Sequence, residues 1–141
     1  MTHRIRRIRR DEQGAAIIEM ALSLPILVVM IYGIFTLGQL FEANAGMQHA
    51  LGEGARYGNL CLSMSGTGTC TVATDTQLSA MVNSKLFGTT NGTFDTPSVD
   101  STTAASGYKT ITVTYHQTMN FLLFTGPAIT ITRSKRVYLA S

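Results

Sequence analysis

Formal charge is absent from one long stretch of this 141-residue chain. The 22 residues from Met20 to Phe41 include no Asp, Glu, Lys or Arg. An α-helix of this length, at about 1.5 Å per residue, crosses a hydrocarbon core of roughly 30 Å. We therefore expect a membrane protein with one transmembrane helix, and the rest of the chain leaves room for one small folded domain.

An excess of positive charge is absent once the first 14 residues are set aside. Residues 15–141 carry six basic and six acidic side chains. They lack the basic surface that nucleic-acid-binding proteins use, so we expect no nucleic-acid partner. The remaining basic residues precede the apolar stretch as Arg4, Arg6, Arg7, Arg9 and Arg10. By the positive-inside rule this leader, residues 1–14, is cytoplasmic and the C-terminal part lies outside.

The sequence also lacks the motifs of common enzymes. It contains no Gly-x-Ser-x-Gly or His-Glu-x-x-His motif and no phosphate-binding glycine loop. His3, His49 and His116 are spread over the leader, the helix and a strand, where we expect ordinary surface or partly buried residues. We expect no enzymatic activity, no small-molecule substrate and no cofactor.

Cysteine is scarce, and the two that occur, Cys61 and Cys70, have no histidine pair nearby. A zinc site is therefore not expected. Both lie on the side of the membrane that we expect to be oxidising, which predicts a disulfide between them. Closing so short a loop contributes roughly 2.5 kcal/mol in the chain-entropy model, and we expect the bond to tie the end of the helix to the head.

The apolar helix is expected to continue outward as a stalk, over residues 15–60. Glu42 to Leu60 contains no proline and keeps a helical spacing of apolar residues. Pro25 removes one backbone donor, which predicts a kink or loosened turn near Leu22 and Ser23. Four small residues then recur every four positions and form a close-packing face, used either by this chain's own head or by a neighbouring helix: Gly46, Ala50, Gly54 and Gly58.

The remaining residues, 61–141, are expected to form a small head with one short helix. Thr74 and Gln77 form a capping box at its start, and Gly88 marks its end. Its apolar stripe consists of Leu78, Met81, Val82 and Leu86. Residues 89–107 are expected to be a loop with one weak edge strand near Phe94, and Asn91-Gly92 is interpreted as a turn rather than a glycosylation site.

Two strands are expected to complete an α+β architecture with an antiparallel sheet. From Lys109 to Gln117, apolar and threonine side chains alternate, which indicates one buried face. A second strand, Ala128 to Thr132, is expected to be interrupted at Arg133 and Lys135 and to resume from Val137 to Leu139 after a bulge. The apolar segment between them, Met119 to Phe124, is either core or an exposed contact patch.

Three motifs in order carry a resemblance to a known family. They are Arg9-Arg10-Asp11-Glu12-Gln13-Gly14-Ala15-Ala16-Ile17-Ile18-Glu19, then Leu24-Pro25, then Met47-Gln48-His49-Ala50-Leu51-Gly52-Glu53-Gly54-Ala55-Arg56-Tyr57. This pattern resembles the TadE family, pilin-like proteins of bacterial tight-adherence (Flp-type) pilus systems, which are related to type IV pili and act in cell adhesion. The resemblance covers about a third of the chain.

The resemblance implies a minor pilin or pseudopilin of the bacterial inner membrane with a periplasmic head. A prepilin peptidase would cut between Gly14 and Ala15, and Glu19 would then pair with the new α-amine of a neighbouring subunit. Such pairing would offset the cost of a carboxylate in the bilayer. The implied partners are the peptidase, other pilin-like subunits, inner-membrane assembly proteins and membrane lipid. Incorporation into an extracellular pilus and N-methylation of Ala15 are left open.

Other readings of the N-terminal region remain. Ala43-Asn44-Ala45 resembles a signal-peptidase site, although the apolar stretch before it exceeds the usual 7–15 residues. A plain signal anchor could also tolerate Glu19 near the cytoplasmic interface, where the positive end of the helix dipole favours an acid. Either reading would give a membrane-anchored or periplasmic binding protein unrelated to pili.

Overall fold

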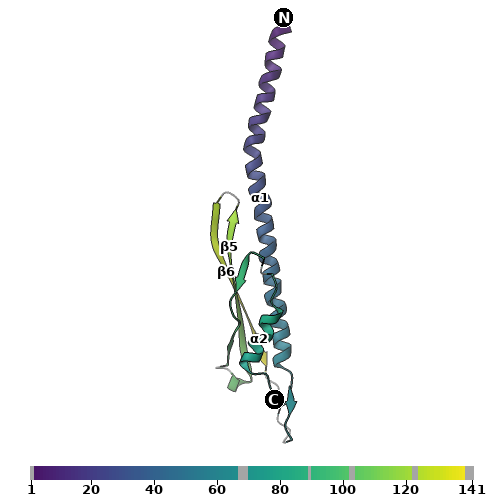
Figure 1. Ribbon diagram of the computed structural model, residues 1–141, viewed down its shortest axis with the longest axis vertical. Helices are drawn as coiled ribbons and strands as arrows, with labels where there is room; N and C mark the ends of the chain where they lie inside the picture. The colour runs from purple at the N-terminus through teal and green to yellow at the C-terminus, as the bar shows by residue number, and fades with distance from the viewer. Residues whose placement is uncertain (1, 67–69, 89, 102–103, 122–123, 139–141) are drawn as a thin grey trace.

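The computed structural model describes residues 2–66, 70–88, 90–101, 104–121 and 124–138, and Figure 1 shows one long helix with a small α+β head along its C-terminal part. Helix α1 spans Thr2–Gly58, a length of about 85 Å. It begins in the leader and ends two residues before the expected Leu60. It stays helical through Pro25, so the loosened turn expected near Ser23 does not interrupt it.

The head is built on one long antiparallel hairpin. Strand β5 (Tyr108–Phe121) pairs with β6 (Phe124–Tyr138) along its length. The other edge of β5 pairs with two short strands, β3 (Gly92–Phe94) at one end and β4 (Ser98–Asp100) at the other. A 3-10 turn, η1 (Ala104–Ser106), precedes β5. The expected combination of a long apolar helix, a short helix and an antiparallel sheet is confirmed.

The alternation predicted for β5 holds, and the strand is longer than expected. Ile111, Val113 and Tyr115 are fully buried on one face, and Gln117 continues that face. Burial, and then the negative charge of Glu42, raise the pKa of the Tyr115 phenol. The inward face of β5 therefore supplies most of the sheet's contribution to the core.

The interruption expected in the second strand is wrong. Strand β6 is continuous, and its register with β5 is regular through Arg133 and Lys135. Arg133 and Lys135 lie on the same face of the strand as Ile131 and buried Val137. The strand therefore needs no bulge to bring Val137 back to the inner face. The irregularity lies near the other end of the hairpin, between Thr118 and Asn120. Leu139, where we expected the strand to end, lies outside the described residues.

The segment expected to hold one edge strand forms two. The chain bends at Thr90 and Asn91, and β3 begins at Gly92, so Asn91-Gly92 is the entry to a strand and not the centre of a hairpin turn. A Cβ at position 92 would overlap the Tyr115 ring, which also packs on Phe94 at 4.8 Å between ring centroids. The glycine is therefore required by packing rather than by turn geometry.

The short helix α2 (Asp75–Lys85) begins with the predicted capping box. The Gln77 amide donates to Thr74 Oγ1 at 3.3 Å, and the Thr74 amide donates to Gln77 Oε1 at 3.0 Å. Leu78 and Val82 are buried. The helix ends at Lys85 and not at Gly88, whose positive φ of 91° lets the chain turn against the backbone of α1.

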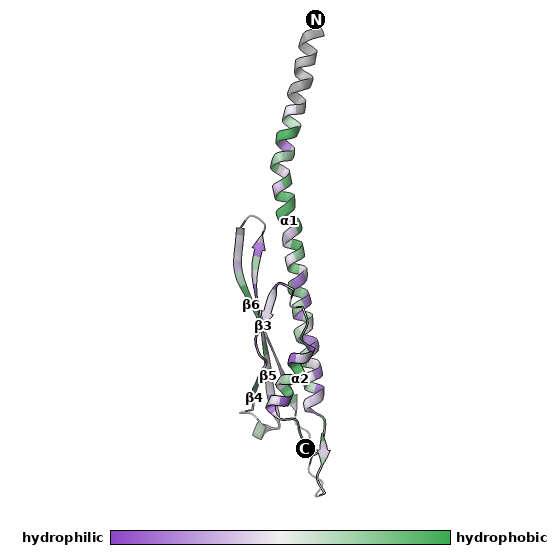
Figure 2. Cartoon of the chain, in the orientation of Figure 1, coloured by the Kyte–Doolittle hydropathy of each residue, from purple (hydrophilic) through white to green (hydrophobic). Residues whose placement is uncertain are grey.

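The hydrophobic core lies between the C-terminal part of α1, helix α2 and the inner face of the sheet. Figure 2 shows these elements side by side, with the apolar N-terminal part of α1 extending away from them. The buried apolar residues of α1 are Ala43, Met47, Ala50 and Leu51. The core is thus anchored on the second half of α1, and the described side chains of the first half, from Gly14 onward, carry no part of it.

The predicted disulfide between Cys61 and Cys70 is present. It closes a small separate hairpin formed by β1 (Ser63–Met64) and β2 (Cys70–Thr71), which follows the end of α1. Cys61 lies between the end of α1 and β1, and Cys70 lies on β2, so the bond links the start of this hairpin to its second strand and does not reach the four-stranded sheet. It is a local crosslink at the end of the molecule farthest from the N-terminus (Figure 1).

Candidate functional site

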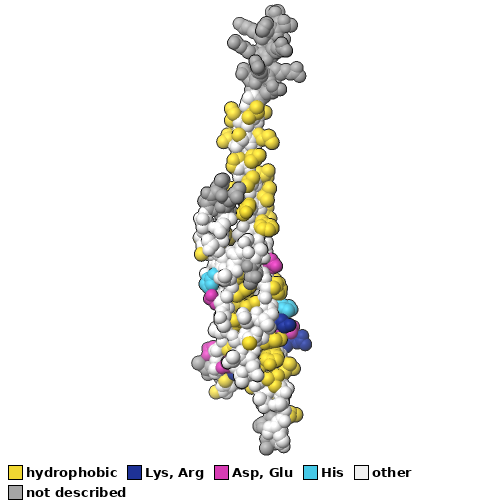
Figure 3. All heavy atoms as spheres, in the orientation of Figure 1, with side chains coloured by type: hydrophobic (Ala, Val, Ile, Leu, Met, Phe, Trp, Pro, Cys, Tyr) yellow, Lys and Arg dark blue, Asp and Glu magenta, His cyan; other side chains and the backbone are white. Residues whose placement is uncertain are grey.

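The candidate site is the part of α1 that extends beyond the head. Every residue from Gly14 to Leu27 is exposed. Within α1 an 18-residue window reaches a mean hydropathy of 2.3, and none of it is buried. Figure 3 shows hydrophobic side chains along the visible face of this part of the helix. By length and composition the helix can cross a membrane, which would remove these side chains from water.

The residues expected to take part in processing and pairing lie on this exposed part. Gly14 has open space around it, and Ala15 is exposed beside it. Glu19 is four residues beyond Ala15, so the two lie on the same helix face. Among the described residues Glu19 forms no ion pair. An acid on an apolar helix that forms no ion pair with the described part of the chain is available for a partner outside it.

The row of small residues faces this chain's own head. A Cβ on Gly46 would overlap the carbonyl of Phe87, and one on Gly54 would overlap the Val82 side chain. A Cβ on Gly58 would overlap Val137, and Ala50 is fully buried. Of the two uses that we considered for this row, the structure places the residues against α2, the loop after it, and β6.

The head also covers the end of the uncharged stretch. Thr36 and Gln39 are 6% and 8% exposed, and the Asn91 side-chain amide donates to Gln39 Oε1 at 2.5 Å. Farther along, Arg133 Nε donates to Asn44 Oδ1 at 3.0 Å. The stretch from Met20 to Phe41 therefore has two environments, one exposed and one packed on the head.

An ion pair holds α2 to the sheet. Lys109 Nζ on β5 lies 2.5 Å from Asp75 Oδ1 in the first turn of α2. The hydrogen bond from Lys109, helped by one from Ser101 and opposed by partial burial, lowers the pKa of the Asp75 carboxyl. Asp75 is also placed where the positive end of the helix dipole favours a negative charge.

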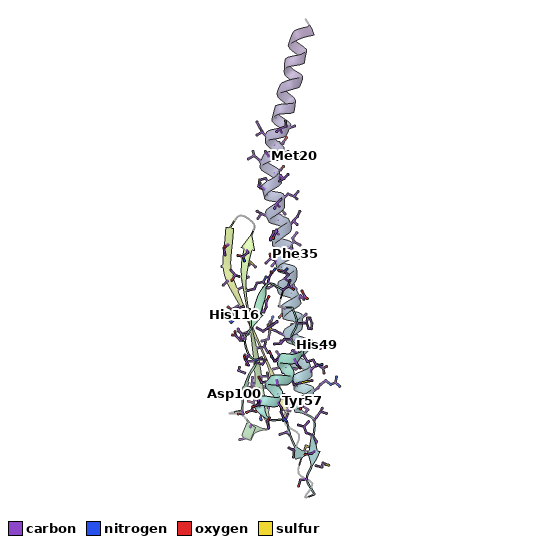
Figure 4. The ribbon with its side chains drawn as sticks, in the orientation of Figure 1. Met20, Phe35, His49, Tyr57, Asp100 and His116 are labelled. Carbon is purple, nitrogen blue, oxygen red and sulfur yellow. A yellow bond between two sulfur atoms is a disulfide. The ribbon has the colours of Figure 1, made fainter. Side chains whose placement is uncertain are left out.

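Two histidines that looked unremarkable in the sequence have partners. His116 lies on the outer face of β5, with Nε2 2.9 Å from Asp95 Oδ2 and Nδ1 3.0 Å from Thr130 Oγ1. The His49 ring contacts that of Phe87, with 5.9 Å between centroids. Asp95 follows β3 and Thr130 lies on β6, the strands that flank this part of β5. The spacing of residues along the sequence does not reveal such pairs. Figure 4 shows His116 and His49 on opposite sides of the head.

The apolar segment Met119 to Phe124 contains the end of β5 and the start of β6. Met119 is half-buried. Leu122 and Leu123 lie outside the described residues, so the choice between core and contact patch is not decided for them. Gln117 was not singled out by sequence, although a polar residue at the buried phase of an apolar strand is an unusual position.

A long exposed apolar helix with a small α+β head is the arrangement of a membrane-anchored pilin-like protein. Residues 14–56 match the sequence profile of the TadE family, described as TadE-like protein, so the resemblance is confirmed over this segment. The match contains the exposed helix, Glu19 and most of the small-residue row, and it supports a structural protein associated with a Tad pilus. Searches of curated proteins and of solved structures give no match.

Proposed function

We propose that this chain is a minor pilin or pseudopilin of a bacterial tight-adherence pilus system. The observation that carries the proposal is the exposed apolar part of α1, inside the segment that matches the TadE family, with Glu19 unpaired among the residues that the structure describes. A helix of this kind is stable in a membrane or against the helices of other pilins. The protein acts through helix packing and serves adhesion as part of an assembly.

In this proposal α1 is inserted in the inner membrane with the leader in the cytoplasm and the head in the periplasm. A prepilin peptidase cuts between Gly14 and Ala15. The freed α-amine of one subunit then pairs with Glu19 of another, which offsets the desolvation of the carboxylate. The partners are the peptidase, other pilin-like subunits and inner-membrane assembly proteins.

Cleavage by signal peptidase after Ala45 is less compatible with the packing. Ala43 and Met47 are both in the core, and Thr36 and Gln39 are also covered by the head. A cut between Ala45 and Gly46 would separate part of this packed face from the rest. The head would lose the contacts of Ala43 and the Gln39–Asn91 hydrogen bond.

The mature N-terminus tests the proposal. The full chain is expressed with and without a prepilin peptidase, and its intact mass and N-terminal sequence are measured. We expect a product that begins at Ala15 only when the peptidase is present. A product beginning at Gly46 would support signal-peptidase processing. An uncleaved product in peptidase-positive cells would support a plain membrane anchor.

A further inference from the structure

A cavity of about 330 Å³ lies between α1 and β5. The helix contributes Tyr32, Phe35 and Thr36, and the strand contributes Gln117, Thr118 and Asn120. Asn91 closes the lining, held to α1 by its hydrogen bond to Gln39. These residues carry amides, hydroxyls and two aromatic rings but no formal charge. The cavity can therefore hydrogen-bond a neutral polar group and contact an apolar one at the same time.

One wall residue has an unused hydrogen-bond donor. Gln117 is 2% exposed, and its Oε1 accepts a hydrogen bond from the Tyr115 hydroxyl at 3.2 Å. Its Nε2 is buried and has no partner among the described residues. Buried polar groups of this kind are normally satisfied, because leaving a donor unpaired is costly. Gln117 is part of the cavity lining, so this unpaired donor belongs to a residue beside the cavity and calls for an acceptor.

The cavity lies where the exposed apolar part of α1 meets the head. Tyr32, Phe35 and Thr36 belong to the uncharged stretch, and Figure 4 shows Phe35 near the β5–β6 hairpin while Met20 lies far beyond it. The helix from Ala15 to Ile31 has 17 residues, about 25 Å, at the lower end of the length that spans a membrane. Polar Asn91, Gln117 and Asn120 cannot face hydrocarbon without hydrogen-bond partners.

An apolar path leads from the cavity toward the N-terminal part of α1. Leu27, Ile31 and Phe35 are four residues apart and lie on one helix face. All three are more than half exposed. A molecule with a polar acceptor in the cavity could therefore extend an apolar chain along this path.

We propose that the cavity binds the interfacial part of a phospholipid from the membrane that α1 spans. The glycerol ester oxygens accept hydrogen bonds from the Gln117 amide and its polar neighbours, and an acyl chain lies along Leu27, Ile31 and Phe35. The uncharged lining suits ester oxygens better than a phosphate, which favours cationic partners. The outer hydrocarbon boundary is then near Tyr32, a residue type common at membrane interfaces, and not near Phe41. The inference rests on the proposed membrane insertion.

Photocrosslinking tests this inference. The full chain is reconstituted in nanodiscs of phosphatidylethanolamine and phosphatidylglycerol, with two probes used separately. One phospholipid carries a diazirine next to the glycerol ester, and the other carries it near the end of an acyl chain. After irradiation, crosslinked residues are mapped by mass spectrometry. We expect the ester probe to label β5 near Gln117 and Asn120, and the chain-end probe to label α1 before Tyr32 but not Phe41.

Variants test the role of the cavity side chains. Gln117→Leu and Asn120→Leu should each lower ester-probe labelling of β5 at least fivefold and leave labelling of residues 15–30 unchanged. Thr114→Val is the matched control, because Thr114 lies on the opposite face of β5 from Gln117. It should leave ester-probe labelling of β5 unchanged. Asn120 is exposed, so its variant remains informative if Gln117→Leu does not fold.

The outcomes separate the two proposals. Labelling of α1 without labelling of β5, unchanged labelling of β5 in the folded variants, or equal chain-end labelling of Leu27 and Phe41 would each overturn the lipid site while membrane insertion stands. An absence of lipid labelling anywhere on α1 would contradict insertion itself, and with it the proposed function.

Discussion

Gly46 has no room for a side chain because the carbonyl of Phe87 occupies the space where a Cβ would lie. The neighbouring Gly88 packs on the backbone of Ala43, so the loop after α2 cannot easily move away. Glycine inside a helix normally costs about 1 kcal/mol relative to alanine. Here that cost is offset by close packing between α1 and the loop.

Gly46→Ala should lower the stability of the head by about 1–3 kcal/mol, because overpacking outweighs the gain in helix propensity. Gly52→Ala is the matched control, since a Cβ there meets nothing within 4 Å. It should raise stability by about 0.5–1 kcal/mol. Denaturant unfolding of the full chain in detergent micelles, followed by near-ultraviolet circular dichroism, measures both. Shifts of the same sign in the two variants would count against this account.

Asp75 makes stability depend on pH. In the folded chain the pKa of Asp75 is lowered from its ordinary value of 3.8. The ionised Asp75 therefore stabilises the fold fully at any pH above the unfolded pKa, and this stabilisation is lost as the pH falls through the folded pKa. Asp75→Asn should therefore be less stable than the unmodified chain at neutral pH, and the difference should vanish well below pH 3.8. Melting temperatures of both chains from pH 7 to 2 test this. A constant difference across that range would contradict it.

At the scale of the elements, the β1–β2 hairpin pairs only within itself among the described strands. In the chain-entropy model the disulfide contributes roughly 2.5 kcal/mol to the stability of the structural unit that it crosslinks. Here that unit is the hairpin rather than the whole head.

The double variant Cys61→Ser/Cys70→Ser should therefore speed amide exchange in residues 61–71 and change the melting temperature of the head only slightly. Hydrogen exchange with mass spectrometry measures the first effect and thermal unfolding the second. Alkylation without reduction should find no free thiol in the unmodified chain. A fall in melting temperature of about 10 °C or more, equivalent to roughly 2 kcal/mol in a domain of this size, would show that the hairpin is coupled to the core.

For the whole molecule, the decisive feature is the division of α1 between the head and its exposed part. The buried residues of α1 lie between Thr36 and Gly58, and every residue from 14 to 27 is exposed. A change on the exposed part should therefore alter assembly without altering the fold of the head. The small-residue row should behave in the opposite way.

Glu19→Gln should be cleaved and inserted normally but assemble poorly with other pilins, because the neutral amide cannot pair with the α-amine of Ala15. Crosslinking and co-purification of the variant, expressed at the normal level, measure assembly. Glu53→Gln, farther along α1, is a control that should assemble normally. Undiminished assembly of Glu19→Gln would show that the carboxylate only lies near the interface.

Local patterns in the sequence determined several parts of this protein. The uncharged stretch gives a continuous apolar helix because it contains no charged residue, and the helix continues through Pro25. The capping box of α2 and the alternation of β5 depend on residues a few positions apart, whose geometry is set by the helical and strand periods. The cysteine pair is close in sequence, so its disulfide required no knowledge of the fold.

The tertiary structure decided which faces meet. Arg133 and Lys135 predicted an interruption of β6, because charged side chains at positions expected to face the core argue against a buried strand face. In the fold the Asn44 side chain of α1 accepts a hydrogen bond from Arg133. Likewise, the spacing of Gly46, Ala50, Gly54 and Gly58 predicted a close-packing face, and only the fold places the head against it. The cavity beside Gln117 also depends on residues from α1, β5 and the segment before β3. Such contacts join distant parts of the chain, and local periodicity carries no information about them.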